Sequence, residues 1–456
     1  MSNFIAVDRN TDYLLPPSVN DWLTEDHLAR FVVEVIDQLD LSNLTRQYLG
    51  RGSKAHHPST LLAILVYGYA TGVFSSRRLE RATYDSVAFR YIAGNSHPDH
   101  DTLAAFRRRF IDELSSLFVQ VLEMAREMKL LKLGTVCLDG TKIHANASRH
   151  SALSHGHIEK LEVQLKTEVQ ELLALAEAAD QADIPDGVSL PEEIKRREDR
   201  LKVMEAAKAK IAARAAERHA REKAQYDEKM ARRAAQEKDT GQKPRGRLPK
   251  PPLEGVRDND QINLTDEESR IMPVAGGGFE QSYNAQAAVD ASTMLVVATG
   301  VTQAPNDKEQ VEPMLATLKA QRTVGTVERV VADTGFCSGK NITACEAAHI
   351  EPLIAVAREG HHPGWRERHS EPPVLPADAT PMQAMAHKLK TQAGRAIYAL
   401  RKQTVEPVFG IIKSVMGFRQ FSLRGLNKVS GEWTLVCLAW NVKRMAVLRP
   451  KCACSG

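Results

Sequence analysis

The first part of the chain carries apolar residues at the spacing of amphipathic helices. Leu28, Phe31, Val32 and Val35 share one helical face, and similar spacing recurs, with breaks, between residues 15 and 125. Pro58 begins a longer apolar helix further on, since proline is well tolerated at the first helical position. The pattern therefore predicts an all-helical N-terminal domain over residues 1–125.

The last helix predicted in this domain carries three consecutive arginines. Asp99 stands where an N-cap is expected, and Arg107, Arg108 and Arg109 follow within the helix. Two helices joined by a tight turn, with exposed arginines, are typical of a helix-turn-helix DNA reader. A plain helical bundle with a solvated arginine face fits the same pattern, so both interpretations stay open.

The apolar pattern changes from helical to strand-like after residue 130. Residues 134–143 contain an apolar run that predicts a buried strand, and Asp139 closes this strand before a glycine turn. Helical spacing returns over residues 152–238, with a turn-forming segment in the middle, and predicts an antiparallel helical hairpin. Residues 240–252 are rich in Gly, Pro and basic residues and are typical of a linker.

Strand and helix patterns alternate through the rest of the chain. Strands are predicted at residues 282–289, 294–302, 327–333 and 351–356. Helices are predicted at residues 307–321, 338–349, 382–416 and 430–448, the first of them capped by Asp307. This order predicts an α/β (α+β mixed) domain, in which helices flank a mixed sheet.

These patterns divide the chain into three predicted domains. The helical N-terminal domain spans residues 1–125 and is the candidate DNA-binding domain. The α/β domain is assembled from residues 130–150 and 255–448, and the helical hairpin with its basic linker is an insertion over residues 152–252.

Composition narrows the compartment and the class of protein. The 456 residues are 43% hydrophobic and 26% charged, as in ordinary globular proteins. No apolar run approaches the roughly 20 residues of a membrane helix, and we expect no secretory signal at the N-terminus. The six cysteines lack the spacing of a zinc site. We therefore expect a cytoplasmic protein with no membrane partner.

The net charge of +4 is unevenly distributed along the chain. Residues 386–451 contain about 13 Lys and Arg against two acids, and residues 192–250 contain about 19 against 11. Basic regions on a nearly balanced chain suggest a surface for a polyanion. For residues 192–250 alone, a solvated and ion-paired exterior explains the charges equally well.

Two acids stand where an α/β sheet presents ligands. Asp139 and Asp333 each follow an apolar strand pattern, and ligands of open α/β sheets bind at strand ends. Neighbouring carboxylates repel each other unless a cation lies between them. Hard oxygen ligands suit Mg²⁺ or Mn²⁺, and two such ions support in-line displacement at phosphorus.

Glu406 is the candidate third acid, because it is the only carboxylate between Pro381 and Gly431. A lone acid among bases is either a satisfied surface residue or a metal ligand beside a DNA channel, and the residues alone leave both open. Pro407 disfavours helical angles at Glu406, so we expect a kink or a helix start there. Turn and N-cap roles explain the other strand-adjacent acids, Asp290 and Asp307.

Five motifs occur in the order found in a known family. They are Pro98–Phe110, Leu138–Ser148, Tyr283–Asp290, Ala332–Ser338, and Glu406 with Lys413. Through them the chain resembles, over nearly its whole length, the DDE transposases of bacterial insertion sequences in the broad IS-five-like group. The resemblance implies an RNase H-like fold, and it implies that Asp139, Asp333 and Glu406 are the catalytic ligands of two Mg²⁺ or Mn²⁺ ions.

The resemblance also implies a set of DNA contacts. The family pattern Tyr-x2-Arg-x3-Glu-x6-Lys is met by Tyr398, Arg401, Glu406 and Lys413, except that Arg401 lies one residue too far from Glu406. Lys402 occupies the expected arginine position, so either base is a candidate for the DNA phosphate.

An aromatic residue adds one further candidate DNA contact. Trp365, in the loop before these helices, is a candidate for stacking on an unpaired or flipped base. Packing of its ring on the domain explains the residue as well.

The activity implied is metal-dependent cleavage of double-stranded transposon-end DNA. The released 3′-OH then attacks target DNA, and a homodimer assembled on DNA in the bacterial nucleoid is the expected form. Two rivals stay open: a DNA-binding protein without catalysis, such as a repressor from a decayed element, and a nuclease that cuts without strand transfer.

Overall fold

A mixed sheet organises the chain after residue 134. The computed structural model describes residues 18–48, 55–177, 189–274, 276–321, 323–357, 370–376 and 378–450. Among them the sheet has six strands in the order β4-β5-β1-β7-β8, and β6 also pairs with β5. The strands are β1 (Thr135–His144), β4 (Arg270–Pro273), β5 (Phe279–Asp290), β6 (Val296–Thr302), β7 (Arg329–Ala332) and β8 (Glu351–Ile354).

The pairing of β1 shows that the sheet is mixed. β1 is antiparallel to β5 and parallel to β7. Both strands bury apolar residues in the core, among them Val136 and Leu138 of β1 and Ala285 and Ala287 of β5, although β5 buries polar side chains as well. The predicted α/β class and its four later strands are confirmed. Asp139 lies in the middle of β1 rather than at its end, because β5 continues to pair with β1 as far as His144.

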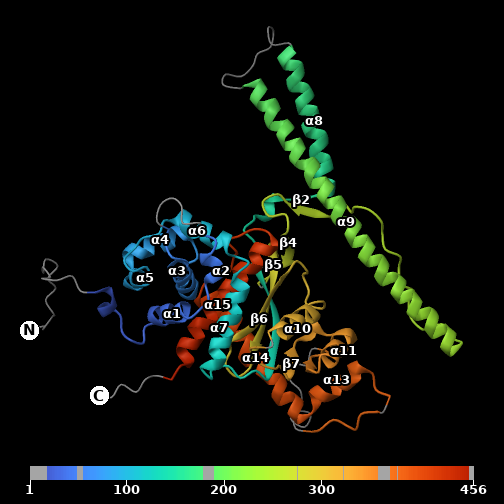
Figure 1. Cartoon of the computed structure of the whole chain (residues 1–456). Coiled ribbons are helices and arrows are strands. Elements are labelled where there is room, and N and C mark those ends of the chain that lie inside the picture. The colour runs from blue at the N-terminus through green and yellow to red at the C-terminus, as the bar shows by residue number, and fades with distance from the viewer. Residues whose placement is uncertain are drawn as a thin grey trace, which may run out of the picture. The chain divides into compact units, whose positions relative to one another are not determined.

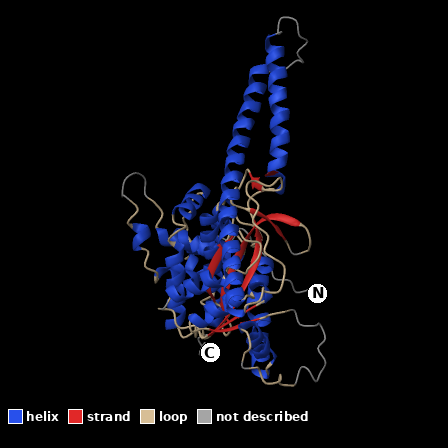
Figure 2. Ribbon diagram, turned by 90° about the vertical axis from the view of Figure 1, so that its right-hand side faces the viewer, coloured by secondary structure: helices blue, strands red, loops and turns tan. Residues whose placement is uncertain are grey.

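Helices flank this sheet (Figure 2). They are α10 (Val311–Ala320), α11 (Gly339–Ala347), α13 (Pro381–Lys390), α14 (Gln392–Gly410) and α15 (Leu426–Leu448). The predicted N-cap at Asp307 is wrong. Helix α10 begins four residues later, at Val311, and Gln310 occupies the N-cap position without a side-chain cap bond.

The N-terminal region is helical, as predicted. After a 3₁₀ turn (Val19–Trp22) its helices are α1 (Leu28–Asp37), α2 (Ser42–Thr45), α3 (Pro58–Thr71), α4 (Ser76–Asp85), α5 (Val87–Ile92), α6 (His100–Arg109) and α7 (Leu114–Glu127). Pro58 occupies the first turn of α3 and Gly72 ends it with a φ of 85°. Asp99 caps α6 by accepting a hydrogen bond from the Thr102 N–H at 2.6 Å.

Helix α15 joins these helices to the sheet. It packs against α3 and α7 as well as against β6 (Figure 1). Its Trp433 is fully buried and donates from Nε1 to the Gln286 carbonyl at 2.8 Å. A buried indole with a satisfied N–H fixes the helix against the sheet.

Helix α14 continues through Pro407. Glu406 therefore lies inside a helix, so of the two predicted alternatives, a kink or a helix start, the helix start is wrong. A π-helical turn, Ile411–Val415, follows α14 directly. Pro407 has no N–H to donate to the preceding turn, and a wider turn nearby is a common way for a helix to absorb such a defect.

A helical hairpin belongs to a second compact unit, formed by residues 147–271 and 277–281. Helix α8 (His155–Glu177) runs beside the first part of α9 (Leu190–Thr240), as Figures 1 and 2 show. Their contact is an apolar stripe that includes Ile158, Leu165, Met204 and Ile211. A hairpin of this kind was predicted; the turn at residues 178–188 lies outside the described residues.

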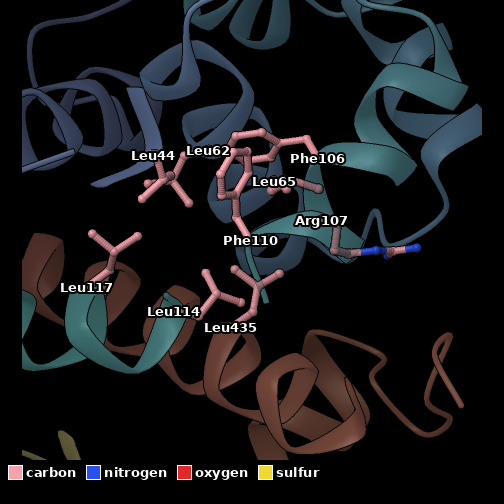
Figure 3. A pocket seen from close by; sticks show the side chains of 9 residues that line it. All are labelled: Leu44, Leu62, Leu65, Phe106, Arg107, Phe110, Leu114, Leu117 and Leu435. Carbon is pink, nitrogen blue, oxygen red and sulfur yellow. The ribbon is translucent and has the colours of Figure 1, made fainter. Parts of the chain in front are cut away.

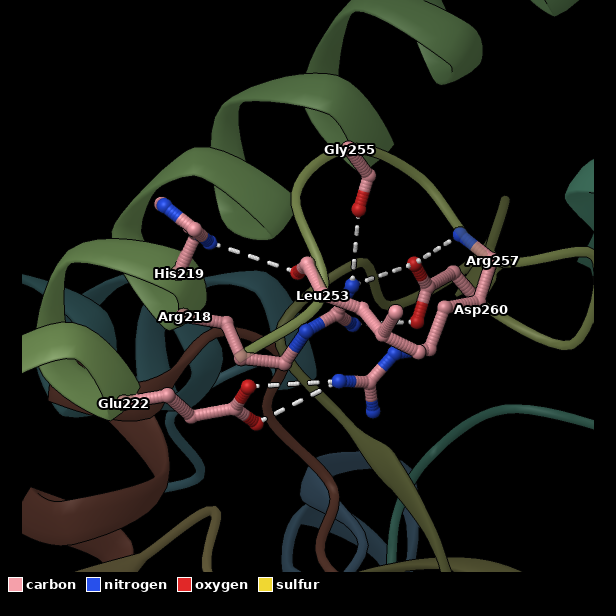
Figure 4. Close-up of polar contacts among 7 residues, drawn as sticks. All are labelled: Arg218, His219, Glu222, Leu253, Gly255, Arg257 and Asp260. Atoms are coloured by element: carbon pink, nitrogen blue, oxygen red, sulfur yellow. Dashed lines mark hydrogen bonds and ion pairs between the residues drawn. The ribbon is translucent and has the colours of Figure 1, made fainter. Parts of the chain in front are cut away.

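The second part of α9 packs against an extended segment of its own unit. Arg218 donates to both carboxylate oxygens of Asp260, and Arg257 is paired with Glu222 (Figure 4). A short two-stranded sheet, β2 (Ala152–Ser154) and β3 (Gln261–Asn263), completes the unit. Many charges of α9 are thus ion-paired, as the exterior interpretation of residues 192–250 expects.

Among the described residues, no single helix has both the length and the apolarity to cross a membrane. Helices α3 and α4 reach the required length and apolarity only when taken together, and a bend of 96° separates them.

Candidate active site

Two acids lie on neighbouring parallel strands. The pairing of β1 with β7 runs through Leu138 and Ala332, and Asp139 and Asp333 are the next residues on the two strands. Asp139 accepts a hydrogen bond from its neighbour's backbone, the Gly140 N–H, at 2.8 Å. Asp333 accepts one from the Gly335 N–H, also at 2.8 Å. Residues nearly 200 positions apart in the sequence are therefore brought side by side.

Arg401 connects the strand acid to the helix acid. Its guanidinium donates from Nη1 to Asp139 Oδ2 at 3.0 Å and from Nη2 to Glu406 Oε1 at 2.8 Å. The side chains of Arg401 and Asp139 are only 14% and 16% exposed, whereas that of Glu406 is 46% exposed. Arg401 thus holds a positive charge between two acids that the sequence predicts as metal ligands.

The ionised form of Asp139 is disfavoured in this environment. Burial raises the pKa of Asp139 to about 6; Arg401 opposes the shift, and the charges of Asp333 and Asp307 add to it. One arginine therefore does not compensate the negative charge at this edge of the sheet. Carboxylates held together in this way bind a divalent cation well.

Two lysines stand beside the acids. Lys413 donates to the Lys142 carbonyl at 2.9 Å, so the two side chains come from adjacent segments. Burial lowers the pKa of Lys142, and the charges of Asp307, Asp139 and Asp333 oppose the shift. Burial also lowers the pKa of Lys413, and the positive charge of Lys142 lowers it further.

The donor set fits a hard divalent cation, although the acids have not converged. Asp139, Asp333 and Glu406 supply only carboxylate oxygens, the ligands that Mg²⁺ and Mn²⁺ prefer. In the described part of the chain, no three His, Cys, Asp or Glu side chains lie close enough together to hold a metal.

Asp307 also lies at this site, which sequence reasoning missed. Its Oδ1 accepts hydrogen bonds from Asn284 Nδ2 at 2.7 Å and from Gln286 Nε2 at 2.6 Å. The sequence did offer a signal, since Asn284 and Gln286 lie two positions apart in a predicted strand and therefore share a face, where buried polar side chains require polar partners.

Two family models match the chain. The model described as "Transposase domain (DUF772)" matches residues 17–109, and the model described as "Transposase DDE domain" matches residues 252–442. The chain belongs to the DDE transposases. No curated protein and no solved structure matched it.

Membership in the DDE transposases establishes the class of activity. The protein is an enzyme that cleaves DNA and transfers strands during transposition, its substrates are DNA, and it depends on divalent metal. Its mixed sheet with flanking helices is the RNase H-like fold of the DDE domain. The match to residues 252–442 covers Asp333 and Glu406, while Asp139 lies before it.

Arg107 is not placed as a DNA contact of this transposase, which corrects the prediction for that residue. It is only 9% exposed and donates from Nη1 to the Tyr69 hydroxyl at 2.9 Å and to the Phe74 carbonyl at 3.1 Å. Figure 3 shows its guanidinium directed away from an apolar cavity lined by leucines and phenylalanines. Burial favours arginine at a fixed internal partner rather than at a DNA phosphate.

The other predicted DNA contacts are placed differently. Arg108 is exposed, and the exposed Arg109 donates to the Gln47 carbonyl at 2.6 Å. Lys402 is exposed on α14, whereas Arg401 faces the acids. Trp365 lies outside the described residues.

Proposed function

We propose that Asp139, Asp333 and Glu406 would hold two Mg²⁺ or Mn²⁺ ions, and that the transposase cuts the ends of the element that encodes it. The pairing of β1 with β7 carries the proposal, because it sets Asp139 and Asp333 on adjacent strands with too little positive charge around them. Glu406 joins them when Arg401 releases it. Arg401 then remains available to a DNA phosphate.

The chemistry follows from this arrangement. When bound, the divalent ions activate the attacking water or hydroxyl and stabilise the leaving oxygen. Asp139 and Asp333 would hold these ions at a fixed place on the sheet, because the Gly140 and Gly335 N–H groups orient the two carboxylates. The first displacement frees a 3′-OH at the transposon end, and that hydroxyl attacks target DNA in the second.

We propose that the DNA backbone runs along the basic side chains near the acids. Lys402 is exposed one residue after Arg401, and Lys413 lies in the π-helical turn that follows α14. Together with Tyr398, and with Trp365, which lies outside the described residues, they are proposed to supply charge for phosphates and rings for stacking. In the N-terminal domain, Arg108 and Arg109 are the remaining candidates for contact with the end sequence.

The assembled form is proposed to be a homodimer on DNA. Two ends of one element must be cut and joined to one target, which two copies of the active site accomplish. The helical hairpin exposes charged faces along its length, and we propose that it contributes to dimerisation or to DNA contact. A variant without residues 152–238 that assembles and binds ends normally would exclude this role.

The test of the proposed function is cleavage in vitro. The purified protein is incubated with the element's own end DNA and Mg²⁺, and both the cut ends and the products joined to target DNA are measured. Cutting at the element's boundary with joining to target is the expected result. Binding without cutting would identify the non-catalytic repressor, and cutting without joining would identify a nuclease.

A further inference from the structure

The carboxylate of Asp307 is oriented by two buried amides. Asn284 and Gln286, at 0% and 2% exposure, both donate to the same oxygen, Asp307 Oδ1. Asp307 precedes α10 by four residues and does not cap it. An N-cap role therefore does not explain why two interior side chains hold this acid in place.

The backbone around the catalytic acids leaves room for Asp307. Gly140 follows Asp139, and a methyl group there would overlap Asp307 Oδ1 and the Gln286 amide nitrogen. Gly335 follows Asp333 by two residues, and a methyl group there would lie 2.9 Å from Asp333 Oδ1 and 3.5 Å from Asp307 Oδ2. Asp307 Oδ2, the oxygen that the two amides leave free, therefore lies near Gly335, as Asp333 Oδ1 does.

A buried acceptor without a partner lies in the same place. Asn284 Oδ1 is buried and has no hydrogen-bond partner, and it would be 2.9 Å from a methyl group on Gly140. Unsatisfied buried oxygens are rare and costly. Asp307 Oδ1 approaches Gly140 as well, so the unsatisfied oxygen lies beside a carboxylate, and this points to a cation or to the water that a cation carries.

We propose that Asp307 is a fourth acidic ligand of the active site and binds the second divalent ion together with Asp333. This inference rests on the proposed function, because it assigns one of its two ions. Mg²⁺ usually keeps several of its waters and takes only one or two carboxylates. The pair of Asp333 and Asp307 would therefore be sufficient, and a water retained by the ion would supply the donor that Asn284 Oδ1 lacks.

The test counts the Mn²⁺ ions bound by the full-length protein with its end DNA. Free Mn²⁺ is measured by electron paramagnetic resonance during titration of wild type, Asp307→Asn and Glu309→Gln. Glu309 is an exposed acid in the same loop, so its variant makes the same charge change away from the site. Wild type and Glu309→Gln should bind two ions, and Asp307→Asn should bind the second ion at least tenfold more weakly.

Two further variants make every result decisive. Asp307→Glu keeps the charge and still offers a carboxylate that accepts from the two amides, so it should fold even if Asp307→Asn does not. It moves the carboxylate by one methylene and should therefore weaken the binding of the second ion. Unchanged affinity for both ions in the Asp307 variants that fold overturns the inference. Asp139→Asn separates this failure from that of the proposed function: it should weaken Mn²⁺ binding, and wild-type binding in that variant would reject the whole site.

Discussion

The acids of the sheet and the acids of the helical hairpin have opposite surroundings. In the hairpin, Glu162 accepts hydrogen bonds from Lys208 and Lys166, and these bonds lower its pKa. The pKa of Asp260 is also lowered, because hydrogen bonds from Arg218 and the Arg257 backbone outweigh its burial. In the sheet, burial raises the pKa of Asp139 to about 6, and neighbouring acids add to the shift.

This contrast separates acids that serve stability from acids that serve chemistry. A paired acid contributes to folding when it is ionised, as in the hairpin. Ionised acids crowded on strand ends oppose folding and are retained where a bound cation uses them. Without metal, the transposase is therefore expected to be less stable than a variant in which one of these acids is replaced by a neutral residue.

The largest expected effect is on catalysis. Asp139→Asn, Asp333→Asn and Glu406→Gln should each reduce cleavage of end DNA by several orders of magnitude, because metal activation and leaving-group stabilisation fail together. The three losses should not add, because the acids act as one unit. Single-turnover cleavage measures the effect, with binding of end DNA as the control that each variant is folded.

Glu406 is the most exposed member of this set, so its variant tests the set most severely. Cleavage by Glu406→Gln within a few-fold of wild type would remove this acid from the active site. It would then leave Glu406 as the surface partner of Arg401.

A smaller effect is expected on stability, with opposite signs in the two regions. Asp139→Asn should stabilise the metal-free protein at pH 7 by up to about 3 kcal/mol, since a pKa shift of one unit corresponds to about 1.4 kcal/mol. Asp260→Asn should destabilise the hairpin unit by about 2 kcal/mol, because Arg218 loses a charged acceptor. Fluorescence of the buried Trp433 and Trp440 reports unfolding around the sheet, and circular dichroism reports the hairpin helices.

The pH dependence should differ in the same way. The folded-state pKa of Asp139 lies above its unfolded value of 3.8, so the wild-type protein should lose stability relative to Asp139→Asn as the pH rises from about 4 to 6. The folded-state pKa of Asp260 lies below 3.8, so its contribution is present above that pH and is lost as the pH falls through the lowered value. If the stabilities of Asp139→Asn and Asp260→Asn, each relative to wild type, changed with pH in the same way, the contrast between the acids of the sheet and those of the hairpin would be wrong.

The smallest effect is expected on DNA binding, again with a matched pair. Lys402→Ala should reduce the salt dependence of end-DNA affinity by about 0.9 in log–log slope, the value for one phosphate contact. Arg232→Ala should leave the slope unchanged, because Arg232 is paired with Glu228 on α9 at 2.7 Å. Fluorescence anisotropy at several salt concentrations measures both. A change for Arg232 and none for Lys402 would place the DNA on the hairpin instead.

Sequence patterns predicted much of the fold because the signals were local. Apolar spacing predicted α3, the hairpin and the main strands, and Asp99 marked the start of α6. The short strands β2, β3 and β4 were missed, since three or four residues carry too little periodicity. The helix start predicted near Pro407 does not occur, because α14 continues through this residue and a π-helical turn follows.

The site was predictable in part. Asp139 and Asp333 follow apolar strand runs, and that position is visible in a single sequence. Asp307 was assigned to a cap by its sequence position, whereas its place is fixed by Asn284 and Gln286 from another strand. Arg107 looked like one of three equal arginines, and only the packing of α6 shows that Tyr69 holds it inside.

The most direct test of the central claim replaces one oxygen of the scissile phosphate with sulfur. Sulfur binds Mg²⁺ poorly and Mn²⁺ better, so a metal held by Asp139 and Asp333 against that phosphate predicts slow cleavage in Mg²⁺ and recovery in Mn²⁺. Asp333→Asn should show no recovery. An equal sulfur effect with both metals for both phosphorothioate isomers would contradict a metal centre at this pair of strands.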